Sequence, residues 1–185
     1  TISPAHTLEA FADLSVQMKG MGADSLCVKD MAGLLSPVAA RSLVQSMKDR
    51  TGLPVQVHSH YTSGMAAMSY LAAIEAGADV VDCAISPFAM GTSQPATETL
   101  VAALAGGCFD TGISLEKLEP VSRYFKEMAE KYHKIMMGLE GVDINILLYQ
   151  IPGGMYSNLV SQLKEQNALE KLEAVLQEVP RVRRE

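Results

Sequence analysis

In the first half of the chain, helical stretches of small and apolar residues alternate with short β-branched runs. Each helical stretch ends at a glycine, and an apolar run follows: SLCV after Gly22, PVQV after Gly52 and VVDCAI after Gly77. Spacings of about 25 to 30 residues match successive βα units. Because the runs are apolar almost throughout, they are typical of strands buried on both faces. The pattern therefore predicts parallel strands covered by helices.

The segments between these runs predict helices over residues 7–20, 37–49 and 64–76, with the glycines in the turns from helix to strand. A fourth helix is predicted from near Pro95, because proline is tolerated in a first helical turn and Glu98 suits its positive end. The sequence thus predicts an α/β core with at least three parallel strands. Periodicity leaves open whether these form a doubly wound sheet or part of a closed barrel.

Beyond the glycine pair of ALAGG, the sequence becomes more charged. It predicts a helix near 115–135 and a second one near 158–178 that ends at Pro180. We therefore divide the chain into 1–135, which contains the strands, and 136–185, a mainly helical extension.

The composition narrows the classes of function. The 185 residues are 48% hydrophobic and carry a formal net charge of -6, which indicates a globular protein and argues against a nucleic-acid-binding surface. The basic tail at Arg181, Arg183 and Arg184 is interpreted as a solvated linker. The three cysteines are widely spaced without a CxxC motif, and no apolar run reaches the roughly 18 residues of a membrane span. We expect a cytoplasmic protein without direct membrane insertion.

The strand PVQV runs directly into His58, Ser59 and His60. In extended geometry the two imidazoles point to the same side, as is required when one strand supplies two ligands to a metal ion. Functional groups collect at the carboxyl ends of parallel strands, where both histidines fall. The alternative is a pair of surface or hydrogen-bonded histidines without a metal.

Lys29 ends the preceding apolar run and is followed by Asp30. An ammonium group has no lone pair for a metal, but a desolvated lysine can lose its proton and react with carbon dioxide. The resulting carbamate is an anionic oxygen ligand. The simpler alternative is a lysine at the strand end that is exposed or paired with Asp30.

Further polar residues follow the third run. Asp82 lies within VVDCAI, where a charged group needs a partner, so both a structural and a catalytic role are open. The loop SPFAMGTSQPATE would lie over the same barrel mouth. Its hydroxyls, Thr92 and Ser93, are placed either to meet a substrate or to cap the helix that begins near Pro95.

Three segments resemble the carboxyltransferase domain of biotin-dependent enzymes: GADSLCVKDMAGLLSP, the stretch from VQVHSHYTSG to GTSQPATETLVAAL, and YQIPGGMYSNLVSQLKEQNAL. The motifs KDMAG, HSHxTSG, GTSQP and IPGGM in this order are specific, whereas HxH alone occurs in other barrel families. The family includes pyruvate carboxylases, the alpha subunit of oxaloacetate decarboxylase and the pyruvate-binding subunit of transcarboxylase. The resemblance implies the C-terminal half of a (β/α)8 barrel followed by a mainly helical region.

The resemblance also implies roles for individual residues. Lys29, as a carbamate, would bind a divalent metal together with His58 and His60, and Thr92 would shuttle a proton, with Ser93 beside it. The family's fourth metal ligand, an Asp, and its pyruvate-binding Arg and Gln come from earlier strands that are not in this chain. We therefore expect the chain to be a fragment. Tyr61 stands where relatives vary, and no role is assigned to it.

The implied reaction moves carbon dioxide between carboxybiotin and pyruvate or oxaloacetate, with the metal stabilising an enolate. Zinc, manganese and cobalt all suit imidazole and oxygen ligands, and zinc is the first expectation. The implied partners are a biotin carrier domain and a second copy of the chain in a homodimer. The direction of the reaction is left open.

Two rival functions are kept. An aldol or Claisen lyase or synthase of the related barrel group also has HxH on a strand, but it lacks the lysine ligand and GTSQP. A scaffold that binds a biotin carrier or a sibling subunit without catalysis is the second rival, because the first strands are not in the chain.

Overall fold

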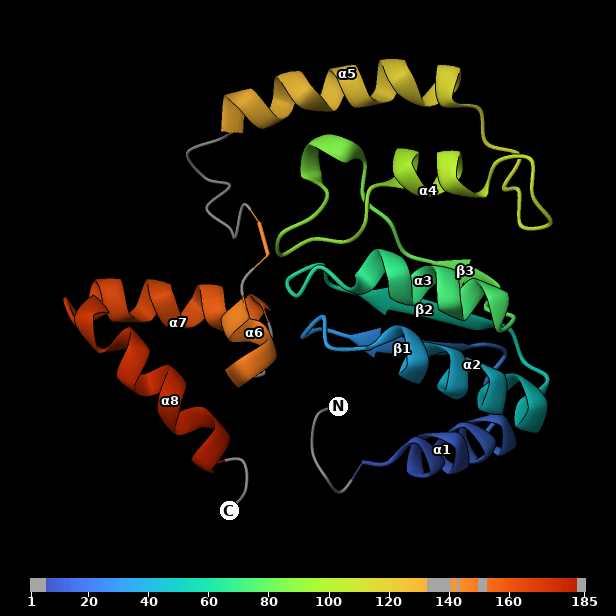
Figure 1. The fold of residues 1–185 in the computed structure, drawn as a ribbon, viewed down its shortest axis with the longest axis horizontal. Coiled ribbons are helices and arrows are strands. Elements are labelled where there is room, and N and C mark those ends of the chain that lie inside the picture. Colours follow the sequence, from blue (N-terminus) through green and yellow to red (C-terminus); the bar gives the residue numbers. More distant parts are fainter. Residues whose placement is uncertain (1–5, 133–140, 143, 150–152, 183–185) are drawn as a thin grey trace.

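The computed structural model describes residues 6–132, 141–142, 144–149 and 153–182 (Figure 1). In this part of the chain, the strands pair in the order β1-β2-β3, and both pairings are parallel. Their bounds are Leu26–Asp30 for β1, Val55–Ser59 for β2 and Val80–Val81 for β3. The parallel α/β core predicted from the sequence is confirmed.

The third strand is shorter than the predicted run VVDCAI. The backbone still bonds to β2 at Asp82, whose N–H donates to the carbonyl of Val57 (3.0 Å). Ala84 then pairs with the segment before the next helix, donating to Pro95 O at 3.0 Å and accepting from Thr97 N at 2.8 Å. This isolated parallel bridge replaces the continued strand.

Four helices follow the predicted positions closely. Their bounds are α1 Leu8–Gly20, α2 Pro37–Thr51, α3 Ala66–Glu75 and α4 Thr97–Leu104. The three turn glycines that were predicted, Gly22, Gly52 and Gly77, all have positive φ values of 94°, 64° and 97°. Because L side chains rarely adopt this region, glycine makes these tight turns accessible.

Only one face of the sheet is covered by α2 and α3 (Figure 1). Val55 and Val57 of β2 are fully buried there and pack in one core with Val44 of α2 and Tyr70 of α3. Gln56 and His58, which alternate with these valines on β2, are only half-buried, and Lys29 on β1 is exposed. The expectation of strands buried on both faces was therefore wrong for the described residues. The predicted strand PVQV is mostly apolar, but the face of the sheet that α2 and α3 do not cover carries polar side chains.

Tyr70 ties the covered face together through its hydroxyl group. The side chain is fully buried, and its oxygen accepts a hydrogen bond from Ser59 N at 2.8 Å while it donates to Asp82 O at 2.8 Å. Burial raises the pKa of Tyr70 far above its usual value, so the phenol is neutral and can donate. One side chain of α3 thus fixes the end of β2 and the end of β3.

The C-terminal part is helical, as predicted, but its helices are divided differently. After η1 Ser86–Phe88, the remaining elements are α5 Leu115–Tyr132, α6 Ile144–Tyr149, α7 Gly153–Glu165, η2 Leu169–Lys171 and α8 Leu172–Val182. The single helix predicted at 158–178 is wrong, because Asn167 adopts a left-handed conformation (φ 52°) and separates α7 from α8. The predicted end at Pro180 was also early, since α8 continues to Val182.

The division into 1–135 and 136–185 stays a prediction, because that boundary lies outside the described residues. The described parts of the two regions approach each other at Gly64, in the loop after β2, where an added Cβ would lie 2.9 Å from Val142 Cγ2. No helix of the described residues is both long enough and apolar enough to cross a bilayer.

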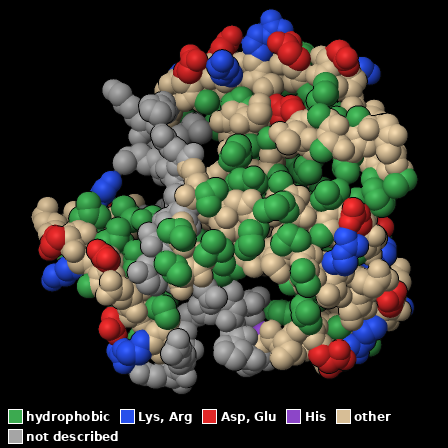
Figure 2. All heavy atoms as spheres, viewed as in Figure 1, with side chains coloured by type: hydrophobic (Ala, Val, Ile, Leu, Met, Phe, Trp, Pro, Cys, Tyr) green, Lys and Arg blue, Asp and Glu red, His purple; other side chains and the backbone are tan. Residues whose placement is uncertain are grey.

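Hydrophobic and charged side chains are unevenly spread over the surface. Figure 2 shows hydrophobic side chains gathered in the middle of the molecular face that is turned toward the viewer. Charged groups lie along α5 and around α1 and α2. Val38 of α2 and Met68 of α3 are 77% and 57% exposed. The outer faces of these helices are therefore not fully polar.

Replacing Tyr70 with phenylalanine tests the role of the phenol. Tyr70→Phe leaves the buried N–H of Ser59 and the carbonyl of Asp82 without this partner, so we expect a loss of about 1–3 kcal/mol in the free energy of unfolding. Urea denaturation measures the loss. Tyr124→Phe on α5, where the side chain is 56% exposed, is the matched control and should change little. Equal stability of both variants would contradict this role.

Candidate metal centre

The uncovered face of the sheet brings the predicted ligands together. In the parallel register, Lys29 of β1 lies directly opposite His58 of β2. Side chains at paired positions of neighbouring strands point to the same face, and His60 follows on that face two residues later. The N–H of His60 donates to Asp30 O at 3.0 Å, so the pairing continues past the end of β2. The two imidazole rings lie with their centroids 5.2 Å apart.

His58 is held by an acid from the neighbouring segment. Its Nδ1 lies 2.8 Å from Asp82 Oδ2, and the other oxygen of Asp82 accepts from Gln56 Nε2 at 2.7 Å. Because an ionised carboxylate can only accept, Nδ1 of a neutral His58 carries the proton. The lone pair of Nε2 is then free to bind a metal ion. Asp82, left open between two roles by the sequence, therefore contacts a candidate ligand.

His60 is held in the same way by a backbone group. Its Nδ1 lies 2.5 Å from the carbonyl oxygen of Thr92, which can only accept. Nε2 of His60 is therefore also left with its lone pair. A second ring nitrogen bound to a carboxylate or carbonyl is the usual arrangement of metal-binding histidines. The donor set thus fits a divalent cation.

Lys29 is exposed, and it forms no hydrogen bond or ion pair with another described residue. Of the simpler alternative, an exposed lysine is what the structure shows, whereas a pairing with Asp30 is not observed. The Asp30 carboxylate instead accepts from Leu34 N, Leu35 N and Ser59 Oγ, at 3.1, 2.8 and 2.7 Å. The expected desolvation of Lys29 is not seen either, because its side chain is exposed among the described residues.

A third ligand is needed to complete the histidine pair. No group of three or more His, Cys, Asp and Glu side chains is placed to hold a metal within the described ranges. Burial, with a contribution from Asp82, raises the pKa of the Cys83 thiol to about 11, so this sulfur is protonated at neutral pH and is not a ready thiolate ligand. A site here therefore depends on an oxygen ligand from a modified Lys29 or from another segment.

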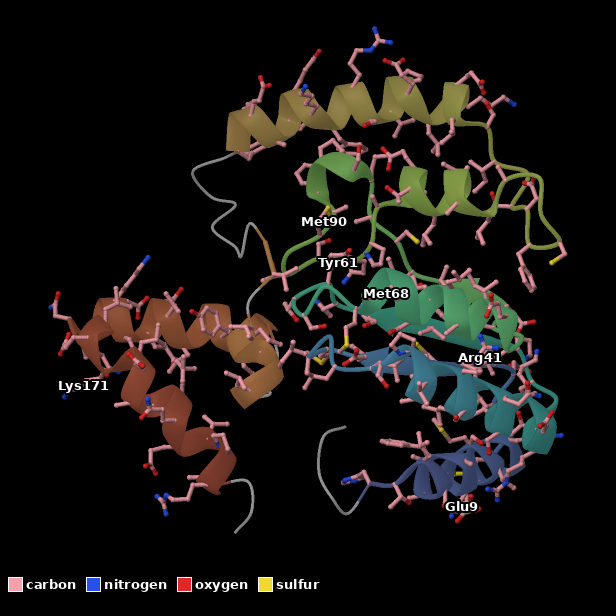
Figure 3. The ribbon with its side chains drawn as sticks, in the orientation of Figure 1. Glu9, Arg41, Tyr61, Met68, Met90 and Lys171 are labelled. Atoms are coloured by element: carbon pink, nitrogen blue, oxygen red, sulfur yellow. The ribbon has the colours of Figure 1, made fainter. Side chains whose placement is uncertain are left out.

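Two loops hold the histidines in place. Gly33, in the loop after β1, passes so close to β2 that an added Cβ would lie 2.5 Å from the carbonyl oxygen of His60. On the other side, Ser93 O accepts from Tyr61 N at 2.8 Å, and Figure 3 shows Tyr61 and Met90 at this end of the sheet. The KDMAG and GTSQP motifs thus both contact the HSH segment.

The loop hydroxyls were predicted either to meet a substrate or to cap a helix. Capping by Thr92 or Ser93 is not observed, because α4 is preceded by Ala96 without a side-chain cap. The Ser93 hydroxyl donates to Gln94 Oε1 at 3.2 Å. The contact of Thr92 with the candidate ligands is through its carbonyl, and the proposed proton shuttle by its hydroxyl stays a prediction.

The sequence reasoning missed Gln56. Its position two residues before His58 placed it on the same face of the strand, which is the signal that could have identified it. Its partner could not be inferred in the same way, because Asp82 lies just beyond the short β3, in a different segment of the chain from Gln56.

Comparison with known proteins finds relatives of the same kind that the sequence motifs resemble. A family profile described as HMGL-like matches residues 3–124, and a second, described as a conserved carboxylase domain, matches residues 146–185. A pyruvate carboxylase subunit of Methanocaldococcus jannaschii is 56% identical over 100% of this chain and 33% of its own length. The 2-oxoglutarate carboxylase large subunit of Hydrogenobacter thermophilus is 42% identical over 100% of this chain and 29% of its own length.

Solved structures of carboxyl transferase domains resemble this chain as well. The carboxyl transferase domain of Rhizobium etli pyruvate carboxylase with pyruvate has a TM-score of 0.89 at 36% identity, covering 95% of this chain and 30% of that one. The expected resemblance to a carboxyltransferase domain and the expected fold class are confirmed. The chain spans about a third of the length of the two subunits named above.

Proposed function

We propose that this chain, which belongs to the HMGL-like family, supplies the metal-binding part of a biotin-dependent carboxyltransferase. The observation that carries the proposal is the paired orientation of His58 and His60. Each ring is held at Nδ1 by a group that only accepts hydrogen bonds, and each leaves Nε2 for a cation.

Lys29 is proposed as the third ligand after reaction with carbon dioxide. Its amine nitrogen would form a bond to the carbon and release one proton, giving a carbamate with anionic oxygens. The register next to His58 supports this assignment, and so does the absence of a competing contact with Asp30. Imidazole nitrogen with oxygen ligands suits zinc, manganese or cobalt, and zinc remains the first expectation.

The substrate is proposed to be a 2-oxo acid, with pyruvate or oxaloacetate first. A bound divalent cation polarises a carbonyl oxygen and makes the neighbouring carbon more acidic. The chain's own residues would orient that cation: Asp82 and the carbonyl of Thr92 fix the rings, while Gly33 brings the KDMAG loop against His60. The Thr92 hydroxyl would carry a proton between the acceptor and biotin.

The proposed partners are a biotin carrier, which delivers the carboxyl group, and a second copy of the chain. A cytoplasmic setting is part of the same proposal. The relatives support carboxyl transfer over the rival lyase, because they are named as a pyruvate carboxylase subunit, a carboxylase large subunit and, in Propionibacterium freudenreichii, a methylmalonyl-CoA carboxyltransferase subunit. The scaffold alternative is separated from the proposal by the variants below.

Lys29 variants test the third ligand in the complete enzyme. Lys29→Ala and Lys29→Arg should both lose metal and carboxyl transfer, because neither side chain can form the carbamate. We expect the drop in metal affinity to reach at least the roughly 10- to 100-fold seen when an outer-sphere partner is lost. The melting temperature of the metal-free protein should not change, since Lys29 is exposed and unpaired among the described residues.

Metal content by atomic emission and transfer from carboxybiotin are the two measurements. Lys126→Ala on α5, where the lysine is also exposed, is the matched control and should keep both. Full metal content and full activity in Lys29→Ala would exclude the carbamate, and the scaffold alternative would gain support if no variant at this site altered transfer.

Thr92 variants separate its hydroxyl from its carbonyl. Thr92→Ser and Thr92→Val both keep the carbonyl that contacts His60, so metal content should be unchanged in each. If the hydroxyl shuttles a proton, the valine variant should lose about 10²- to 10⁴-fold in carboxyl transfer while the serine variant keeps measurable activity. Transfer at the parent rate in Thr92→Val would limit Thr92 to positioning His60.

A further inference from the structure

Gln56 is a polar side chain between two buried valines of β2. Its neighbours Val55 and Val57 are fully buried on the covered face, while Gln56 is half-buried on the face that carries His58. Its amide donates to Asp82 Oδ1 at 2.7 Å, and Asp82 Oδ2 lies 2.8 Å from His58 Nδ1. The three side chains therefore form one hydrogen-bonded row along the face of the sheet.

We infer that Gln56 is a positioning residue that acts on the metal ligand His58 through Asp82. This inference rests on the proposed function, because it assigns the residue that orients one of the two histidines. Gln56 would not contact the cation or the substrate. Its effect would be to fix which oxygen of Asp82 faces His58 and in which plane.

The anchoring of Asp82 shows why its side chain needs this partner. The backbone of Asp82 is fixed on both sides, because its N–H donates to Val57 O at 3.0 Å and its carbonyl accepts from the Tyr70 hydroxyl at 2.8 Å. The terminal torsion of an aspartate is broad, so a fixed backbone does not determine the plane of the carboxylate. Two hydrogen bonds, one to each oxygen, do determine it.

The direction of the hydrogen bonds follows from the carboxylate. Asp82 accepts at both oxygens, so Gln56 must donate through its Nε2 and His58 through Nδ1. This arrangement selects the tautomer of His58 that has the free lone pair on Nε2. Weakening the bond from Gln56 should therefore lower the population of the metal-binding arrangement of His58.

The inference predicts that a defect at position 56 can be repaired at position 82. In Gln56→Glu, two acceptors face each other and the carboxylates repel, so Asp82 is displaced from His58. In the double variant Gln56→Glu/Asp82→Asn, the new amide can donate to the glutamate and accept from His58 Nδ1 with its remaining oxygen. The row is restored with the hydrogen bond between positions 56 and 82 reversed.

The test uses the purified full-length protein at mildly alkaline pH, with Co²⁺ as the probe. Chelator competition gives the Co²⁺ affinity, and ¹⁵N NMR of labelled histidine reports the tautomer of His58 in the metal-free protein. We expect Gln56→Glu to lower the Co²⁺ affinity by about 10- to 100-fold and to reduce the Nδ1-protonated tautomer. The double variant should recover most of both.

A matched pair on α2 serves as the control. Gln45 Nε2 donates to Asp49 Oδ1 at 2.9 Å on an exposed surface, so Gln45→Glu and Gln45→Glu/Asp49→Asn apply the same changes away from the site. These variants should leave Co²⁺ affinity and the His58 tautomer unchanged.

Two results would overturn the inference: a parental Co²⁺ affinity and tautomer in Gln56→Glu, or a loss in Gln56→Glu that the second substitution does not repair. Failure of the proposed function looks different. In that case the parent protein itself binds no Co²⁺ at these histidines. The ¹⁵N NMR comparison of Gln56→Glu with the parent protein still shows whether Gln56 controls the tautomer of His58.

Discussion

The parallel pairing of β1 with β2 is the constraint on which the candidate site depends. It sets Lys29 opposite His58 without any bond between their side chains. A shift of the register by one residue would turn the side chains of one strand to the other face. Lys29 would then point into the core beneath α2, and Asp30 would face the histidines. The site therefore follows from the same backbone hydrogen bonds that hold the sheet together.

Hydrogen bonds on the covered face of the sheet also fix the backbone that carries the two histidines on the other face. Ser59 lies on the covered face, where its hydroxyl donates to the Asp30 carboxylate and its N–H donates to the Tyr70 oxygen. These bonds fix the backbone between His58 and His60. Buried polar groups of this kind must be satisfied, so the core itself holds the two rings at their spacing.

Much of the fold was accessible from the sequence because its signals are local. The turn glycines, the helix positions up to α4 and the placement of HSH at a strand end depend on neighbouring residues, and the structure agrees with them. The break at Asn167 depends on a left-handed residue that also fits a helix, so periodicity joined α7 to α8. The sequence pattern did not reveal the partly polar second face of the sheet, because a strand this short shows few alternations of polar and apolar residues. The role of Gln56 depends on the position of Asp82, whose backbone beyond β3 is held by its hydrogen bond to Val57.

The proposed centre is tested most directly by diffraction with anomalous scattering at the metal edge, on crystals of the complete protein grown with zinc. The account predicts one peak at about 2.0 to 2.2 Å from Nε2 of both His58 and His60, with additional density for a carboxylate on Lys29. A peak bound through Nδ1 would contradict it, and so would a metal-loaded crystal in which the two Nε2 atoms share no peak.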